Sequence, residues 1–404
     1  MGEENIKDLQ SVLRPLLGDQ LIVVSQKVKN LLQPGENYGS HIVDIQAQIK
    51  KNPDAENEDL HLIGKLPPKT QAQLDMFDPS FVFRKEIFTY SKILPYYRQL
   101  EIDNSIGEDD VFDVSPKYYG SRMSLNPDCQ FDHDAVLLLE NLKPKGYYCV
   151  DRRFGSDLAH AKCAVKALAH FHALGMATKE KDPEFFEILT KNATCLEVKN
   201  REVFLTLFKQ RIEEIGNDPE LKEYLEACLE NFKGFSPDAW TAVPEEPWST
   251  IIHSDFWANN MLYHRKDNET EPDDIKFIDY QNFLFMSPLR ELTFFLGSGL
   301  DENANKHIDE LIDLYYKSLI ERLEKLGCNT ELYSRESFDK KLVGDARVEF
   351  IHSLGHIKIM TMEVAADDPD GKNLVNLMGS TRDNDNFTKR LRYFVKTYYE
   401  KGWL

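Results

Sequence analysis

The sequence predicts an α+β chain of two lobes, a small β-rich lobe followed by a large, mainly helical one. At 404 residues, the chain exceeds the length at which one hydrophobic core usually stops growing, so two cores are expected. Apolar and polar residues alternate over 41–50, as in half-buried strands, whereas most apolar residues after 157 recur at helical spacing. We place the lobe boundary after residue 142, which gives lobes of 1–142 and 143–404.

The small lobe is predicted to contain a helix, a loop, two strands and a second helix, in that order. Helical periodicity covers residues 1–33 and stops at Pro34 and Gly35. The later elements follow from alternation, polarity and amphipathic spacing: a strand at 41–50, a polar turn at 51–59, a strand at 60–66 and a helix at 81–97.

Lys65 and Glu86 form the first pair with a chemical meaning. Lys65 interrupts an apolar strand, and a buried lysine usually has a partner. Glu86 lies on the following helix, where it can face Lys65. In phosphoryl-transfer enzymes such a pair holds the phosphates of a nucleotide. The alternative is that Glu86 is a solvated helix carboxylate.

A fully apolar strand at 136–139 ends at Glu140 and is followed by irregular backbone from Lys143 to Gly146. A buried strand followed by exposed backbone suits a hinge between lobes that meets the edge of an adenine. Glu140 and Leu142 are therefore candidate nucleotide contacts, although any buried strand before a loop has the same pattern.

The large lobe begins with a helix over 157–177, for which Ser156 is a plausible N-cap, and residues 301–326 predict a later helix. Its paired histidines do not predict a metal site, because no carboxylate or cysteine stands beside them at ligand spacing. We expect these four to be structural: His170, His172, His352 and His356.

The most informative segment runs from Ile251 to Gln281. An apolar run leads into a loop that carries His253 and Asp255, Asn260 closes the loop, and a second apolar run ends at Asp279. Phosphoryl transfer needs an aspartate that orients the attacking hydroxyl and accepts its proton, together with an amide and a carboxylate as oxygen ligands for Mg²⁺. We therefore predict Asp255 as the catalytic base and Asn260 and Asp279 as metal ligands, with His253 bracing the loop.

Asn260 and Asp279 lie farther apart along the chain than the usual short hairpin between such strands. The extra length falls in residues 264–274, which contain no large apolar side chain and predict an extended, solvent-facing turn. A longer turn leaves both strand ends in place, so the chemical interpretation is unaffected.

Composition excludes several classes of function. The net charge of −19 and the pI near 5.1 argue against binding to nucleic acid or to an anionic membrane surface. Six scattered cysteines without a C-x-x-C pair fit reduced thiols, and the acidic N-terminus lacks the features of a signal peptide. We expect a cytoplasmic protein with no membrane span and no evident protein partner.

Six motifs together resemble the ecdysteroid kinase-like family, which is similar to aminoglycoside and choline kinases within the protein-kinase-like fold. They are Gly35-Glu36-Asn37-Tyr38-Gly39-Ser40, Gly-Lys65-Leu-Pro, Lys-Glu86-Ile-Phe, Leu-Leu-Glu140-Asn-Leu142, His253-Ser-Asp255-Phe-Trp257-Ala-Asn-Asn260 and Phe-Ile-Asp279-Tyr-Gln281.

The resemblance implies a bilobal kinase-like fold and an ATP- and Mg²⁺-dependent phosphotransferase with an alcohol group as acceptor. The named substrate class is steroids of the ecdysteroid type, and other small hydrophobic alcohols are included. Five residues of the first motif would cover the nucleotide phosphates: Gly35, Asn37, Tyr38, Gly39 and Ser40. Protein kinases are disfavoured, because the G-x-G-x-x-G, H-R-D, D-F-G and A-P-E segments are absent.

The chain departs from the family pattern at two positions. Ser254 stands where glycine is common, which changes the backbone freedom of the loop. Glu291 stands where related kinases usually have aspartate, and its longer side chain puts the usual loop-bracing hydrogen bond in question.

The acceptor is not identified by sequence. Phe256 and Trp257 stand beside the predicted base and either contact a hydrophobic acceptor or pack in the core. Other substrate walls are expected from 180–250 and 340–380. The alternatives are a non-catalytic protein that binds a nucleotide or small molecule, a kinase for a choline-like, aminoglycoside-like or xenobiotic acceptor, and a metal hydrolase, which lacks further ligands at close spacing.

Overall fold

The computed structural model describes residues 5–31, 40–69, 74, 78–195, 201–362 and 385–404, and these form two compact units. The small unit contains the described residues up to 92 and residues 115–146. The large unit contains 93–114, 147–362 and 385–404. The predicted α+β class is therefore confirmed, with one β-rich unit and one mainly helical unit. The predicted boundary after 142 differs in assigning 93–114 to the first lobe and 143–146 to the second.

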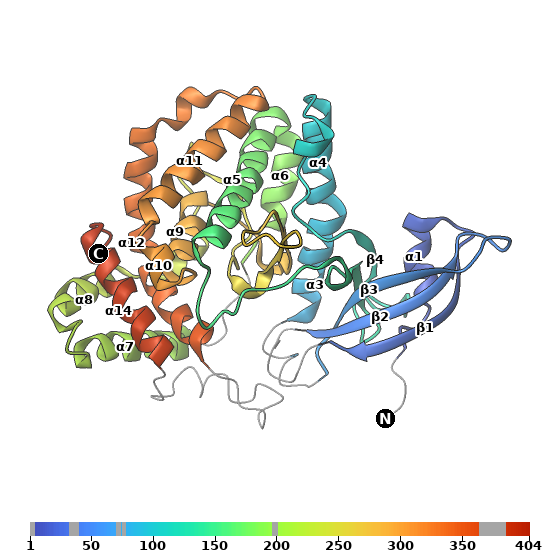
Figure 1. Ribbon diagram of the computed structural model, residues 1–404, viewed down its shortest axis with the longest axis horizontal. Helices are drawn as coiled ribbons and strands as arrows, with labels where there is room; N and C mark the ends of the chain where they lie inside the picture. Colours follow the sequence, from blue (N-terminus) through green and yellow to red (C-terminus); the bar gives the residue numbers. More distant parts are fainter. Residues whose placement is uncertain (1–4, 32–39, 70–73, 75–77, 196–200, 363–384) are drawn as a thin grey trace. The chain divides into compact units, whose positions relative to one another are not determined.

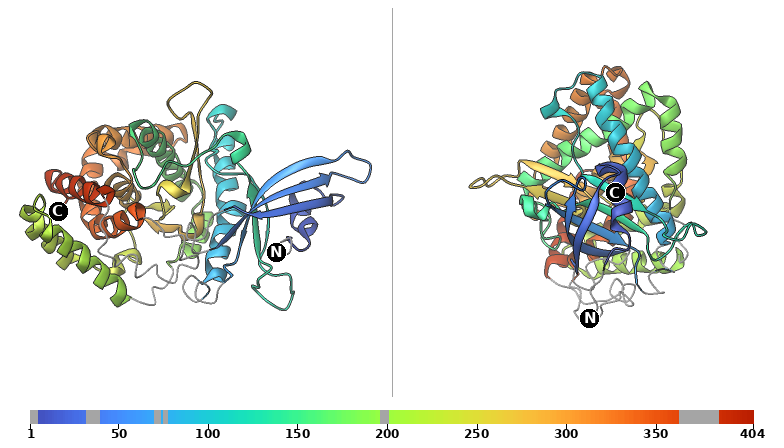
Figure 2. Two further views of the ribbon diagram at one scale, coloured as in Figure 1. Left: turned by 60° about the horizontal axis from the view of Figure 1, so that its bottom comes forward. Right: turned by 90° about the vertical axis from the view of Figure 1, so that its right-hand side faces the viewer.

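The small unit is built on one antiparallel sheet with the strand order β1-β2-β3-β5-β4 (Figure 1). Helix α1 packs on it through Leu9, Val12 and Leu13, which share a buried cluster with apolar residues of β2, β3 and β5. Figure 2 shows the long hairpin formed by β2 and β3. The elements are α1 (Leu9–Leu17), β1 (Ile22–Asn30), β2 (His41–Lys50), β3 (Glu58–Leu66), α3 (Pro79–Phe88), β4 (Tyr118–Arg122) and β5 (Val136–Glu140).

The prediction of helix over 1–33 is wrong beyond α1. Gly18, at φ 108°, ends the helix, and residues 22–30 form β1. Polar residues recur in this segment at a spacing that also suits a helix. In the structure, β1 is an edge strand, and its side chains are half-buried or exposed, so its polar residues face solvent. Its antiparallel pairing with β2 supplies the backbone hydrogen bonds, and this partner lies outside the local sequence pattern.

The predicted helix at 81–97 is confirmed but is longer and irregular. It consists of α3, a π-helical segment η1 (Thr89–Ile93) and α4 (Leu94–Asp103). Pro95 lacks an N–H group, and its ring would collide with the carbonyl group four residues earlier in a regular helix. The wider π turn ahead of Pro95 accommodates it.

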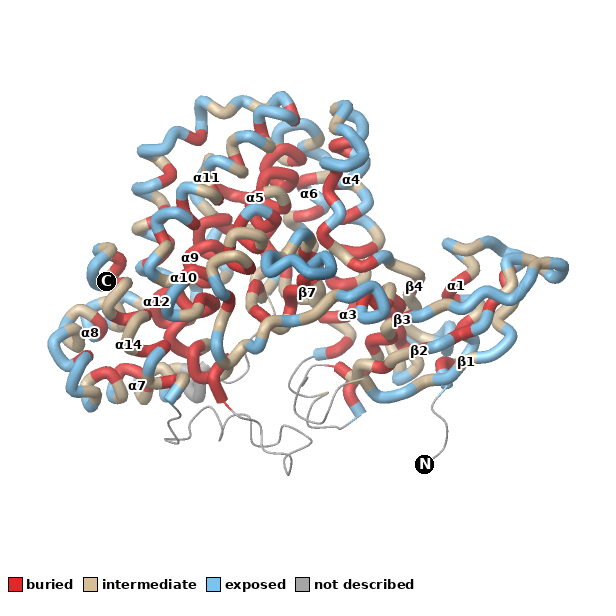
Figure 3. Tube along the Cα trace, in the orientation of Figure 1, coloured by how far each residue is buried: buried red, intermediate tan, exposed pale blue. Residues whose placement is uncertain are grey.

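The large unit is a set of packed helices with two short strand pairs. Helix α5 packs against α11, and α9 packs against α12; Figure 3 shows α5 buried along most of its length. None of the described helices is both long and apolar enough to cross a bilayer. The helices are α5 (Leu158–Lys181), α6 (Pro183–Asn192), α7 (Arg201–Asn217), α8 (Leu225–Gly234), α9 (Pro288–Ser298), α10 (Glu302–Asn305), α11 (Ile308–Lys325), α12 (Arg335–Thr361) and α14 (Asp385–Glu400).

The strand pairs of the large unit carry the predicted catalytic segment. Strand β6 (Thr250–Ile252) pairs with β9 (Leu284–Met286), and β7 (Met261–His264) pairs with β8 (Asp274–Phe277). Short 3-10 helices complete the chain: η2 (Glu108–Asp110), η3 (Lys143–Lys145), η4 (Lys222–Tyr224), η5 (Pro237–Trp240), η6 (Ala258–Asn260), η7 (Tyr280–Asn282) and η8 (Thr330–Tyr333).

The N-terminus of α5 is capped by Asp157, not by Ser156. The Asp157 carboxylate accepts a hydrogen bond from the backbone N–H of His160 at 3.0 Å. Ser156 is fully buried and its backbone bonds to Gly299 and Asp301 instead. Asp157 is a good cap in its own right, so the predicted helix start is displaced by one residue.

The histidines of α5 are structural, as expected. His170 bonds to Glu101 at 2.6 Å, and His172 bonds to Tyr315 and Glu291 at 2.7 and 2.8 Å. Glu101 is fully buried and also accepts hydrogen bonds from Arg322 and from the backbone N–H of Phe112. This carboxylate ties α4 and the segment after it to α5 and α11, which explains why residues 93–114 belong to the large unit.

Glu101→Ala is expected to lower the free energy of unfolding by about 1–3 kcal/mol or more, because it leaves the buried backbone N–H of Phe112 and the ring of His170 without their acceptor. Urea denaturation measures the loss. Glu324→Ala, an exposed change on α11, is the control and should change stability by less than about 0.5 kcal/mol. Equal stability of the two variants would contradict the prediction.

Candidate active site

His253 connects the catalytic loop to the strand that leads to Asp279. It follows β6, whose three residues are all buried, and is itself 1% exposed. Its Nε2–H donates to the carbonyl of Ile278 at 2.9 Å, and its Nδ1 accepts the backbone N–H of Asp255 at 3.3 Å. Both ring nitrogens are therefore used within the protein, and His253 braces the loop as predicted.

Asp255 and Asn260 are joined at the two ends of the loop. The Asn260 Nδ2 donates to the Asp255 backbone carbonyl and to its Oδ2, both at 2.9 Å. Asp255 is partly exposed, whereas Asn260 is buried. The amide thus orients the carboxylate, and its own oxygen Oδ1, the predicted metal-binding atom, lies outside this pair of hydrogen bonds.

The hairpin of β7 and β8 brings Asn260 and Asp279 together. Met261 pairs with Phe277, and the N–H of Ile278 donates to the carbonyl of Asn260 at 3.1 Å. Asn260 precedes β7 and Asp279 follows β8, so the two predicted metal ligands lie at the same end of one hairpin. The turn at 265–273 is mostly exposed, as its polarity predicts, and leaves the strand ends paired.

Two non-glycine residues of the site adopt left-handed backbone conformations. Ser254 has φ 67° and Asp279 has φ 66°. Each such residue costs about 1–3 kcal/mol, and strain of this kind persists only where neighbouring contacts impose it. The conformation of Ser254 is one that glycine adopts freely, so the glycine expected here from the family resemblance would avoid this strain.

Glu291 makes the bracing hydrogen bonds that its longer side chain put in question, so that expectation is wrong. Its Oε2 accepts the backbone N–H of His253 at 3.0 Å and Nε2–H of His172 at 2.8 Å, and its Oε1 accepts the backbone N–H of Ser254. Glu291 lies in the first turn of α9, where the helix dipole favours a negative charge. The longer side chain spans the space from α9 to the loop.

The predicted pair of Lys65 and Glu86 is present in the small unit. Their charged atoms are 2.6 Å apart, and both side chains are almost completely buried. Lys65 is near the end of β3 and Glu86 lies on α3. The interpretation of Glu86 as a solvated carboxylate is therefore wrong.

The other predicted nucleotide contacts have mixed outcomes. Ser40 is buried directly before β2, and Leu142 is buried two residues after the end of β5. Glu140 ends β5 and pairs with Lys145 at 2.5 Å. The remaining predicted contacts lie outside the described residues: Gly35, Asn37, Tyr38 and Gly39.

The two aromatic residues beside Asp255 differ. Phe256 is 1% exposed and packs edge-on against Phe277 and Phe295, with ring centroids 4.9 and 5.4 Å apart, so it belongs to the core. Trp257 is partly exposed. Phe256 is therefore a core residue. A contact between Trp257 and the substrate stays a prediction.

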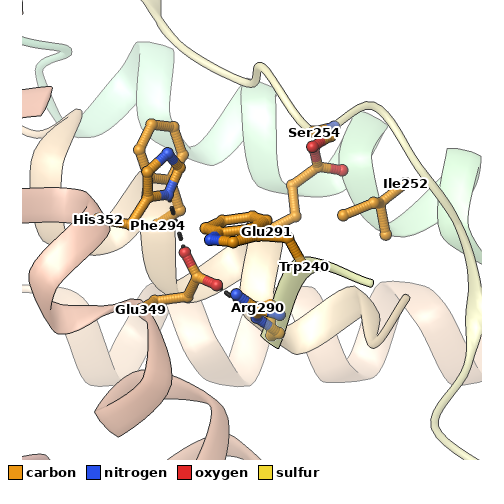
Figure 4. Close-up of a pocket in the computed structure, with 8 residues that line it drawn as sticks. All are labelled: Trp240, Ile252, Ser254, Arg290, Glu291, Phe294, Glu349 and His352. Carbon is orange, nitrogen blue, oxygen red and sulfur yellow. Dashed lines mark hydrogen bonds and ion pairs between the residues drawn. The ribbon is translucent and has the colours of Figure 1, made fainter. Parts of the chain in front are cut away.

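A small cavity lies beside Ile252 and Ser254, against α9 (Figure 4). The substrate walls expected from 180–250 and 340–380 stay a prediction. Trp240, Glu349 and His352 fall within these ranges and line this cavity together with Arg290 and Phe294 of α9.

The chain belongs to the ecdysteroid kinase-like family, whose model matches residues 34–328. Family and site together define a phosphotransferase that acts on hydroxyl groups. None of the curated protein sequences compared with this chain matches it.

Several solved kinase structures are similar to this chain at low identity. A spectinomycin phosphotransferase in complex with ADP and spectinomycin is 11% identical, with 94% of each chain covered and a TM-score of 0.46. An ethanolamine kinase of Plasmodium vivax is 12% identical, with 98% of this chain and 87% of that chain covered and a TM-score of 0.37. A choline/ethanolamine kinase family protein of Mesorhizobium loti is 12% identical, with 91% and 92% covered and a TM-score of 0.35.

His253 makes the site sensitive to acid. Burial lowers the pKa of His253, although the nearby Glu291 carboxylate opposes this effect. The folded state thus favours the neutral imidazole of His253. The stabilising contribution of His253 is complete above its unfolded pKa of about 6.5, and it is lost as the pH falls toward its lowered folded pKa. Protonation would also place a hydrogen on Nδ1, which accepts the Asp255 N–H.

We expect the free energy of unfolding to fall as the pH drops below about 6.5, and to fall less steeply in His253→Gln than in the wild type. Chemical denaturation at several pH values measures both slopes. His133→Gln, at an exposed position of the small unit, is the control for replacing a histidine. Parallel slopes for wild type and His253→Gln would show that His253 does not contribute.

Proposed function

We propose that this protein uses ATP and Mg²⁺ to phosphorylate a hydroxyl group of a small hydrophobic alcohol, with steroids of the ecdysteroid type as the first class to test. The observation that carries the proposal is the single hydrogen-bonded frame that joins Asp255, Asn260 and the segment leading to Asp279. We also propose a cytoplasmic location, in agreement with six cysteines that are all free thiols.

Asp255 is proposed to orient the acceptor hydroxyl. Asn260 holds its Oδ2, which limits rotation of the carboxylate, and partial exposure leaves the group within reach of a substrate. A carboxylate in this position accepts a hydrogen bond from the hydroxyl and takes its proton as the bond to phosphorus forms. Holding the hydroxyl in line with the phosphate supplies much of the rate enhancement in reactions of this type.

The donor set at the hairpin end fits Mg²⁺. An amide oxygen of Asn260 and a carboxylate of Asp279 are hard oxygen ligands, and Mg²⁺ commonly takes one or two protein ligands alongside phosphates and waters. When bound there, it would neutralise charge on the phosphate oxygens. Within the described part of the chain, no cluster of three or more His, Cys, Asp or Glu side chains could hold a metal alone, so no observation favours a metal hydrolase.

The nucleotide is proposed to contact the small unit. Lys65, positioned by Glu86, would pair with phosphate oxygens, as the corresponding ion pair does in kinases. Ser40 and its four predicted neighbours would cover the phosphates with backbone amides. Glu140 and Leu142 would meet the base.

Asp255→Asn is expected to reduce kcat by about 10²–10⁴-fold with little change in nucleotide affinity, because it removes the proton acceptor and leaves the fold intact. Asp279→Ala is expected to abolish Mg²⁺-dependent turnover. Mass spectrometry of reactions with ATP and Mg²⁺ detects the added phosphate across a panel of steroids, phenols, glycosides and amino alcohols.

Asp267→Asn, in the exposed β7–β8 turn, is the matched control and should retain full activity. Phosphorylation of a compound by wild type and Asp267→Asn but not by Asp255→Asn supports the enzyme. Nucleotide binding without phosphate transfer to any compound would instead favour a non-catalytic binding protein.

A further inference from the structure

A buried chain of hydrogen bonds runs behind the catalytic loop, through side chains that the proposed chemistry does not use. It begins at Tyr315 of α11, passes through His172 of α5 and ends at Glu291 of α9. The Tyr315 oxygen lies 2.7 Å from Nδ1 of His172, and Nε2 of His172 lies 2.8 Å from Oε2 of Glu291. Tyr315 and His172 are 0% exposed and Glu291 is 3% exposed. Solvent does not reach these groups, so each finds its hydrogen-bond partners within the protein.

One arrangement of hydrogens satisfies every group in this chain. The Glu291 carboxylate only accepts, so Nε2 of His172 carries the hydrogen between them. In a neutral imidazole the other nitrogen, Nδ1, is an acceptor, and Tyr315 donates its hydroxyl hydrogen to it. Burial and the nearby charge of Glu291 raise the pKa of Tyr315 well above its usual value, which keeps this hydroxyl protonated. Tyr315 thus fixes the tautomer of His172, and His172 orients the Glu291 carboxylate.

The orientation of the Glu291 carboxylate determines how the catalytic loop begins. Its two oxygens accept the backbone N–H groups of His253 and Ser254, the two residues that precede Asp255. Figure 4 shows the Glu291 side chain extending from α9 toward Ser254. Rotation of the carboxylate would break its hydrogen bonds to the loop, and the hydrogen bond from His172 opposes that rotation.

His172 also holds the strand that leads into the loop. Its backbone carbonyl accepts a hydrogen bond from the hydroxyl of Thr250, the first residue of β6, at 3.0 Å. Gly175, about one turn farther along α5, lets β6 approach closely, because a Cβ atom at this position would lie 2.2 Å from Oγ1 of Thr250. One residue of α5 therefore fixes both the strand before the loop and the carboxylate that holds the start of the loop.

Resting on the proposed function, we propose that His172 and Tyr315 are positioning residues for phosphoryl transfer. Tyr315 holds the imidazole and the imidazole holds Glu291, so that the loop presents Asp255 to the acceptor hydroxyl in a fixed orientation. Apolar side chains of similar size would fill the same space between α5 and α11 without the cost of burying polar atoms. The polar atoms of the pair act on the loop through Glu291, and neither residue touches the reacting atoms.

Tyr315→Phe removes the donor to His172 and leaves the size of the ring unchanged. We expect it to lower kcat by about two- to tenfold, the effect of one hydrogen bond, with the KM values for acceptor and nucleotide unchanged. Tyr316→Phe, at the next residue of α11, is the matched control. The Tyr316 hydroxyl donates to the carbonyl of Tyr333 at 2.9 Å, so this variant also loses one hydrogen bond but should keep the wild-type kcat.

Two replacements of His172 separate positioning from packing. Glutamine places an N–H group near the position of the imidazole Nε2, so His172→Gln should retain most of the wild-type kcat. His172→Leu removes the donor to Glu291 and should lower kcat by about tenfold or more. Chemical denaturation measures the stability of both variants. Equal kcat values for the two variants, or losses of kcat that only follow losses of stability, would overturn the inference.

Hydrogen exchange of the loop amides separates this inference from the proposed function. NMR measures exchange of the N–H groups of His253 and Ser254 without any turnover. Faster exchange of these two amides in Tyr315→Phe and His172→Leu than in wild type and Tyr316→Phe supports the inference even where no compound is phosphorylated. Unchanged exchange of both amides in Tyr315→Phe, or equal kcat values for the two tyrosine variants, would overturn it.

Discussion

The site depends on one buried carboxylate, that of Glu291. It accepts hydrogen bonds from two consecutive backbone N–H groups of the catalytic loop and from a histidine of α5, and it sits in the first turn of α9. A carboxylate accepts hydrogen bonds only, so three converging donors suit its charge. A buried charge is costly unless it is paired in this way, and the pairing ties the loop to two of the central helices.

Hydrogen bonds connect Glu291 through the loop backbone to the proposed reacting groups. The loop held by Glu291 carries Ser254 in a left-handed conformation, and His253 extends the contact to Ile278, next to the left-handed Asp279. Strained conformations survive where surrounding contacts over-determine them. Here those contacts keep Asp255, Asn260 and Asp279 in a frame set before any substrate arrives, which is the condition for effective alignment of reactants.

Neighbouring residues of α9 serve different parts of the site. Glu291 braces the loop, while Arg290, one residue earlier, pairs with Glu349 on α12 and is covered by Trp240. A shift of α9 would therefore move both the loop and the cavity beside it. Both carboxylates beside Arg290, those of Glu291 and Glu349, are paired within the protein. The polar atom left without a partner there is therefore a donor, Arg290 Nη2, although the chain has a net charge of −19.

The sequence by itself determined those features that depend on local pattern: the strands β2 and β5, the helix that carries Glu86, and the loop and hairpin that carry Asp255, Asn260 and Asp279. Alternation and spacing encode these directly. The tertiary structure decided what depends on partners distant along the chain. β1 became a strand through pairing with β2, Glu101 drew residues 93–114 into the large unit, Glu291 reached a loop 38 positions away, and Arg290 was left with an unused donor. A hydrogen bond depends on distance and direction in space, which residue spacing does not specify when the partners lie on separate elements.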